Sequence, residues 1–303
     1  MKIQRRDFIK HSALGLGGLW VAPGLGAKQA EATGHFNPFT RLALGRTGLK
    51  VSRLCMGTGS HGSRRESNQT RLGQGEYERL LREAHERGVG MFDLADLYGS
   101  HAGFANAMHG VPRDKYCLVT KIWWRPGSSL PEPDRPDADV VVERFLGELK
   151  TDHIDLLLLH CVKDADWPQR LRRQMDILSR LKAQGKIRAL GVSCHTLAAL
   201  QSAACEPWVE SVHARINPYG MSMDGAPEQV VPVLRKIHAA GKGVVGMKII
   251  GEGRLRNDPL RRAESIRFAL NLGCVDVLNV GFEKTAELED FIAQVRRTQI
   301  VKG

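Results

Sequence analysis

The sequence lacks the aromatic-rich basic runs that are typical of nucleic-acid-binding proteins. It also lacks the closely spaced cysteines that are typical of disulfide-rich and zinc-binding proteins. Aromatic residues make up only 6% of the 303 residues. No basic run is interleaved with them, so the net charge of +11 does not support nucleic-acid binding. Many arginines stand beside acids in helical patterns, as in Glu143-Arg144, which indicates solvated helix faces. The six cysteines contain no Cys-x-x-Cys pair and no zinc-ligand spacing, so we expect free and mostly buried thiols.

The sequence also lacks an apolar run of the ~20 residues that span a bilayer. A weakly apolar stretch at 13–22 follows a basic head, and Ala30-Glu31-Ala32 fits a signal-peptide cleavage site. Within the head, Gln4-Arg5-Arg6-Asp7-Phe8-Ile9-Lys10 resembles a twin-arginine (Tat) export signal, which is an address read by a receptor and not an anchor. We therefore expect residues 1–32 to be a signal peptide. The expected partner is the Tat translocation machinery, with no stable membrane anchor. The expected location is periplasmic, or cytoplasmic where the signal is not used.

From residue 33 onward, short apolar runs alternate with segments of helical spacing. A hairpin is predicted around Gly45-Arg46-Thr47-Gly48, at 41–54, where it would plug one end of the fold. Helical segments place apolar residues at i, i+3, i+4 and i+7, as Tyr77, Leu80, Leu81 and Ala84 do. Eight apolar runs are predicted as strands: 54–57, 91–95, 116–122, 154–159, 187–193, 212–216, 244–249 and 275–280. Repeated strand–helix units of this kind predict the α/β class, and specifically a closed (β/α)8 TIM barrel over residues 33–303.

An open, doubly wound sheet is the alternative architecture. Such sheets usually carry a Gly-x-Gly-x-x-Gly turn that leads directly from the first strand into a helix. Here the corresponding turn reads Gly57-Thr58-Gly59-Ser60-His61-Gly62, and a polar loop follows it. We do not interpret this turn as a dinucleotide fingerprint, and the barrel is favoured.

Four polar residues stand near the carboxyl ends of three successive predicted strands: Asp93 and Tyr98, then Lys121, then His160. In a barrel these strand ends meet at one face. A buried aspartate would keep a lysine charged, and an ammonium beside a phenol would lower the phenol's pKa from its reference value of about 10. A histidine can donate a hydrogen bond to a carbonyl. Such a unit can protonate the alkoxide that forms when a carbonyl accepts a hydride.

Three segments carry these residues: 92–99, Val119-Thr120-Lys121 and 154–160. A fourth segment, 186–193, extends the pattern. Together they resemble the aldo/keto reductase family, and the resemblance runs from Leu42 onward. It implies a (β/α)8 barrel with a hairpin plug and a catalytic tetrad at the four positions above. It also implies an NAD(P)H-dependent oxidoreductase that reduces an aldehyde or ketone, or oxidises the alcohol, with Tyr98 as proton donor. The implied partner is a small-molecule carbonyl substrate.

The same resemblance implies a cofactor site at the ends of the first, fifth, seventh and eighth strands. Its candidate residues are Gly57, Thr58, Ser193, Cys194, Lys248, Gly251, Gly281 and Lys284. The sequence departs from the family at strand six, where His213 and Ile216 replace a frequent glutamine and a stacking tyrosine. Lys284, next to Glu283, is the one basic residue at the expected position of the ribose 2′-phosphate. The resemblance implies NADP as the cofactor, with NAD as the other possibility.

Two other functions stay open. A zinc-dependent barrel would use ligands from a set of imidazoles and thiols: His61, His160, His195, Cys161 and Cys194. The leading interpretation includes no metal. A non-catalytic, cofactor-sensing or binding barrel is the other alternative, and the complete tetrad argues against it.

Overall fold

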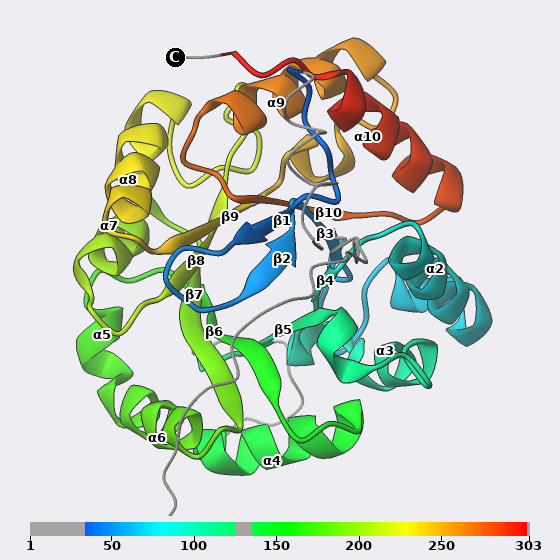
Figure 1. Cartoon of the computed structure of the whole chain (residues 1–303). Coiled ribbons are helices and arrows are strands. Elements are labelled where there is room, and N and C mark those ends of the chain that lie inside the picture. The colour runs from blue at the N-terminus through cyan, green and yellow to red at the C-terminus, as the bar shows by residue number, and fades with distance from the viewer. Residues whose placement is uncertain (1–33, 125–134, 302–303) are drawn as a thin grey trace, which may run out of the picture.

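The computed structural model describes residues 34–124 and 135–301. The predicted signal peptide lies outside the described residues. Eight parallel strands form a closed barrel in the order β10-β3-β4-β5-β6-β7-β8-β9 (Figure 1). The strands are β3 (Leu54–Gly57), β4 (Met91–Asp93), β5 (Cys117–Ile122), β6 (Ile154–Val162), β7 (Ile187–Cys194), β8 (Ser211–Arg215), β9 (Gly243–Met247) and β10 (Val277–Gly281). The predicted (β/α)8 barrel is confirmed.

Helices surround the barrel and bury their apolar faces against it. α2 buries Tyr77, Leu80, Leu81 and Ala84, the face that the sequence spacing predicts. The α-helices are α2 (Gln74–Glu86), α3 (His101–Ala107), α4 (Ala138–Leu149), α5 (Trp167–Arg170), α6 (Arg172–Ala183), α7 (Leu197–Cys205), α8 (Pro227–Ala239), α9 (Pro259–Asn271) and α10 (Thr285–Arg297). Short 3-10 turns occur at η1 (Thr70–Leu72), η2 (Asp96–Tyr98), η3 (Arg113–Lys115) and η4 (Gly251–Gly253).

The hairpin forms a separate two-stranded antiparallel sheet, β1 (Arg41–Ala43) with β2 (Lys50–Ser52). Leu44, Leu49 and Val51 pack with residues of the barrel strands in one buried cluster. Its turn approaches the start of β9 closely, because a Cβ atom at Gly45 would lie 2.3 Å from Gly243 N. The hairpin therefore covers the amino-terminal end of the barrel, and the carboxyl end is left for the functional site.

One predicted strand boundary differs in a way that matters for the site. The fourth strand was predicted to end at residue 159, but β6 continues to Val162 and contains His160. Its pairing with β7 shifts register between Leu159 and Val162, and Cys161 has a φ of +55°. This irregularity sets the local direction of the chain at His160, as bulges near barrel rims commonly do.

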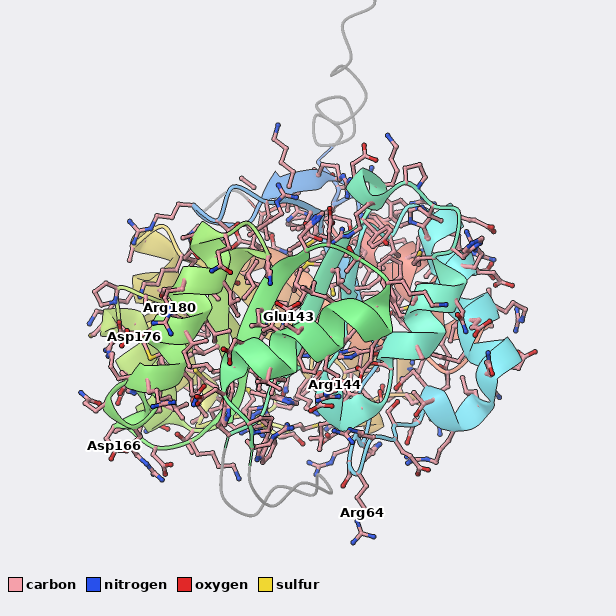
Figure 2. The ribbon with its side chains drawn as sticks, turned by 90° about the horizontal axis from the view of Figure 1, so that it is seen from below. Arg64, Glu143, Arg144, Asp166, Asp176 and Arg180 are labelled. Carbon is pink, nitrogen blue, oxygen red and sulfur yellow. The ribbon has the colours of Figure 1, made fainter. Side chains whose placement is uncertain are left out.

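Charged side chains cover the outer helices. Figure 2 shows Glu143 and Arg144 on α4, and Asp176 and Arg180 on α6, on the outer side of the barrel. Acids and bases are mixed on these faces, as the sequence pattern indicates. Within 34–124 and 135–301, none of the helices has the length and apolar character needed to cross a membrane.

Candidate active site

The buried pair of Asp93 and Lys121 forms the base of the site. Asp93 ends β4 and Lys121 lies in the neighbouring strand β5. Lys121 Nζ lies 2.6 Å from Asp93 Oδ1 and donates to the Leu94 carbonyl oxygen at 2.8 Å. Burial raises the pKa of Asp93, but the Lys121 ammonium outweighs this and holds the pKa well below its usual range. The carboxylate therefore stays ionised beside Lys121.

Tyr98 lies directly above this pair, at the end of η2. Lys121 Nζ is 4.9 Å from the centre of its ring. Two glycines of the loop after β3 border the ring. A Cβ atom at Gly59 would lie 2.2 Å from Tyr98 Cε2, and one at Gly62 would lie 2.3 Å from Tyr98 Cδ1. Since any larger side chain would collide with the ring, these glycines allow the loop to hold Tyr98 in place.

His160 faces the hydroxyl of Tyr98. The Tyr98 Oη and His160 Nε2 atoms are 3.2 Å apart, and the two rings meet edge to face with centres 5.5 Å apart. Burial, together with the charge of Lys121, holds the pKa of His160 well below 6.5. The ring is therefore neutral at physiological pH and carries one N–H group that can hydrogen-bond an oxygen atom beside Tyr98.

The expectation that Lys121 lowers the pKa of Tyr98 is wrong for this geometry. Burial raises that pKa well above 10, and the negative charges of Asp93 and Glu252 contribute in the same direction. The Lys121 ammonium is directed at Asp93 and at the Leu94 carbonyl, not at the phenol oxygen. Tyr98 is thus a protonated phenol at neutral pH, which is the state that a proton donor requires.

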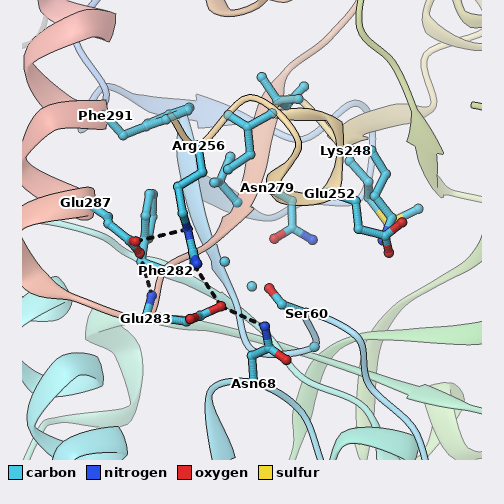
Figure 3. Close-up of a pocket in the computed structure, with 18 of the residues that line it drawn as sticks. Ser60, Asn68, Lys248, Glu252, Arg256, Asn279, Phe282, Glu283, Glu287 and Phe291 are labelled. Carbon is cyan, nitrogen blue, oxygen red and sulfur yellow. Dashed lines mark hydrogen bonds and ion pairs between the residues drawn. The ribbon is translucent and has the colours of Figure 1, made fainter. Parts of the chain in front are cut away.

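A cavity of about 450 Å³ opens over Asp93 and Tyr98 and continues along the carboxyl ends of β9 and β10. Its volume lies within the usual ~300–1,000 Å³ of ligand sites. Figure 3 shows Lys248 and Glu252 on one side of the cavity. On the other side lie three charged residues, Arg256, Glu283 and Glu287, and Asn279 lies between the two groups.

Three of the eight cofactor candidates line this cavity: Gly57, Lys248 and Gly281. Lys248 forms an ion pair with Glu252. The other five do not line it: Thr58, Ser193, Cys194, Gly251 and Lys284. Thr58 is buried, and its hydroxyl donates to the Asp93 carbonyl oxygen at 2.9 Å. Lys284 is exposed at the start of α10.

The sequence interpretation missed Asn279. Its Nδ2 donates to Asp93 Oδ2 at 2.6 Å, so the carboxylate is held from β10 as well as from β5. A polar amide near the end of an otherwise apolar strand is the signal that could have found it. His213, which the sequence singled out only as a departure, has Nε2 3.4 Å from Asp93 Oδ1. Burial lowers the pKa of His213, so this ring is neutral too.

With this geometry established, the chain can be compared with known proteins. The model of the aldo/keto reductase family matches residues 53–297. This chain belongs to the aldo/keto reductase family. It is 28% identical over 294 residues to the aldo-keto reductase AFTS1 of Alternaria alternata, covering 86% of this chain and 76% of that protein. It is 26% identical to the uncharacterized oxidoreductase YrpG of Bacillus subtilis, covering 81% and 77%.

A solved aldo-keto reductase, AKR11C1 of Bacillus halodurans in its holo form, has the same fold with a TM-score of 0.70. The two share 21% identity over 88% of this chain and 93% of that one, so this likeness concerns the fold. Family membership supports an oxidoreductase. Ile216, which stands where the resemblance implies a stacking tyrosine, is fully buried after strand β8, so that position presents no aromatic surface.

The zinc interpretation finds no support in the same region. Among the described residues, no group of three or more histidine, cysteine, aspartate or glutamate side chains is arranged to hold a metal ion. Cys161 Sγ lies 3.4 Å from His195 Nε2, but burial raises the pKa of Cys161 to about 12. This single thiol–imidazole contact does not make up the four-ligand set of a structural zinc site.

Proposed function

We propose that this aldo/keto reductase reduces an aldehyde or ketone with a nicotinamide dinucleotide, and that Tyr98 donates the proton. The observation that carries the proposal is the placement of Tyr98 Oη within 3.2 Å of His160 Nε2, above the buried Asp93–Lys121 pair. A carbonyl oxygen next to Tyr98 and His160 would lie within reach of a proton and of a second hydrogen-bond donor.

Each residue of the tetrad has a distinct part in this reaction. Tyr98 gives its proton to the oxygen as negative charge develops there, and His160 orients the carbonyl through its N–H group. The charge of Asp93 opposes the phenolate left on Tyr98, and the Lys121 ammonium bonded to Asp93 offsets that charge. The dinucleotide supplies the hydride for this chemistry, or accepts it in the reverse direction.

The cavity residues fit such a cofactor. Asn279 lines the cavity, and its side-chain oxygen is a buried acceptor that has no hydrogen-bond partner among the described residues. Lys248 supplies a cation that could approach a pyrophosphate by exchanging its bond to Glu252. The family resemblance favours NADP, and NAD remains the alternative.

The decisive experiment compares Tyr98→Phe with the native enzyme in NADH and NADPH oxidation over a panel of aldehydes and ketones. The variant keeps the ring, so packing should survive. Turnover should fall by ~10²–10⁴-fold, the usual contribution of acid catalysis, while dinucleotide affinity changes little. Tyr219→Phe is the matched control, because Tyr219 bonds to Glu264 on the surface and does not line the cavity. Near-normal turnover of Tyr98→Phe would make the non-catalytic barrel the better hypothesis.

We also propose that the protein is exported by the Tat machinery to the periplasm. The support is the Arg5-Arg6 pair with Phe8, Ile9 and Lys10 behind it, since this spacing is typical of the receptor-read twin-arginine signal.

A further inference from the structure

The wall of the cavity formed by α10 and the segment before α9 carries a net negative charge. Arg256 Nη2 lies 2.8 Å from Glu283 Oε1, and Arg256 Nε lies 3.2 Å from Glu287 Oε1 (Figure 3). Two carboxylates therefore share one guanidinium. The remaining charged groups of this wall, Arg262 and Asp290, pair with each other at 2.8 Å and cancel.

Both carboxylates are held in place by further bonds. Asn68 Nδ2 donates to Glu283 Oε1 at 2.7 Å, and the Glu283 backbone N–H donates to Glu287 Oε2 at 2.9 Å. Partial burial raises the pKa of Glu283, but the hydrogen bonds from Asn68 and Arg256 outweigh it and lower this pKa below its usual value. Glu283 is therefore ionised at neutral pH.

Arg71 and Lys284 come near this wall without lining the cavity. Arg71 donates to Asn68 Oδ1 at 2.8 Å and pairs with Glu66 at 3.7 Å. Lys284, the residue expected from the sequence to bind a 2′-phosphate, is exposed at the start of α10 and is not part of the cavity wall. The cavity wall therefore carries Glu283 and Glu287 in the region where the sequence analysis expects Lys284.

If the proposed function holds, the position of this wall assigns it to the nucleoside of the cofactor that lies away from the nicotinamide. Hydride transfer requires the nicotinamide ring beside Tyr98, and Glu252 lies close enough to Tyr98 for its charge to raise the phenol pKa. A dinucleotide is elongated, so its second nucleoside must lie away from Tyr98. In the described cavity, the wall across Asn279 from Glu252 is the one that carries Arg256, Glu283 and Glu287.

We propose that Arg256, Glu283 and Glu287 form a ribose-binding cluster that selects NAD(H) over NADP(H). A ribose 2′-hydroxyl is neutral and can donate a hydrogen bond to a carboxylate, which is how acidic residues commonly recognise NAD. A 2′-phosphate would bring nearly two negative charges toward two carboxylates whose shared guanidinium is already engaged. This like-charge contact disfavours NADP(H).

Calorimetric titration of the full-length protein with NADH and with NADPH tests the proposal without relying on turnover. We expect NADH to bind at least tenfold more tightly, which corresponds to about 1.4 kcal/mol. The double variant Glu283→Gln with Glu287→Gln should bind NADPH at least tenfold more tightly than the native protein does and lose most of the preference. Glu287→Gln alone should shift the ratio in the same direction.

Glu289→Gln is the matched control, because it removes the same charge from the same helix. Glu289 does not line the cavity and pairs with Arg87 at 2.8 Å, so its removal should leave the ratio unchanged. Equal or tighter binding of NADPH to the native protein would overturn the proposal and leave the proposed function standing. So would a native preference for NADH that survives in the double variant. Failure to bind either dinucleotide would reject the proposed function itself.

Discussion

Lys121 Nζ lies 2.6 Å from Asp93 Oδ1, and the two side chains are 0% and 5% exposed. Removing the cation from such a pair leaves an uncompensated buried carboxylate. Lys121→Met should therefore lower the free energy of unfolding by about 3–5 kcal/mol and also reduce turnover, because the charge of Asp93, which disfavours the phenolate of Tyr98, is then no longer offset. Urea denaturation and steady-state kinetics measure the two effects.

Lys242→Met is the control for this prediction. Lys242 is also buried, but its ammonium donates to the carbonyl oxygens of Ala203 and Glu206 at 2.8 and 2.7 Å. Its removal leaves unpaired neutral acceptors, so we expect a cost of about 1–3 kcal/mol and normal turnover. Equal losses of unfolding free energy in the two variants would show that the Asp93–Lys121 ion pair stabilises the fold no more than hydrogen bonds to neutral acceptors do.

Gly59 is expected to be intolerant of substitution because of Tyr98. A Cβ atom at Gly59 would lie 2.2 Å from the Tyr98 ring, so Gly59→Ala should displace the ring from His160 and reduce turnover by at least tenfold. Gly75→Ala adds the same methyl group in α2, where no heavy atom beyond the neighbouring helix backbone lies within 4 Å, and should leave turnover unchanged. Steady-state turnover of both variants tests this prediction. Normal turnover of Gly59→Ala would show that catalysis does not depend on the exact position of the Tyr98 ring.

The barrel was predictable because its signals are local. The apolar spacing of α2 and the apolar runs of the strands can each be recognised within a short stretch of sequence. Parallel strands then bring Asp93, Lys121 and His160 to one face by topology alone. The contact of Asn279 with Asp93 joins residues 186 positions apart. The amide stands out in its apolar strand, but neither segment identifies its partner. Arg256 likewise reaches the carboxylates of Glu283 and Glu287 only through packing of the β9–α9 segment against the start of α10.

Local chemistry was harder to predict than position. The sequence places a lysine beside a tyrosine, which indicates a lowered phenol pKa. It does not reveal that the ammonium is directed at Asp93 and the Leu94 carbonyl, nor how strongly burial raises the pKa of Tyr98. The extension of β6 past His160 was missed for a related reason, since a bulge depends on the register with the neighbouring strand.

The buried histidines make stability depend on pH. Burial, with the charges of Arg215 and Lys248, lowers the pKa of His195 from 6.5 to about 3. Below about pH 6.5 the unfolded chain binds a proton that the folded chain does not, so stability falls as pH falls, by up to about 1.4 kcal/mol per pH unit. His195→Asn should flatten this dependence between pH 6.5 and pH 4 in urea denaturation, whereas His109→Asn, on the surface, should not. Identical slopes in all three proteins would contradict the assignment.

Export should depend on the arginine pair near the amino terminus. Arg5→Lys combined with Arg6→Lys keeps the positive charge but removes the guanidinium groups of the signal pattern. We therefore expect full-length, folded protein to accumulate in the cytoplasm, whereas the native chain appears in the periplasm shortened near Ala30-Glu31-Ala32. Cell fractionation and intact-mass measurement distinguish the two. Arg172→Lys with Arg173→Lys changes an equivalent exposed pair on α6 and should leave export intact. Equal amounts of the two double variants in the periplasm would show that residues 5 and 6 are not an export signal.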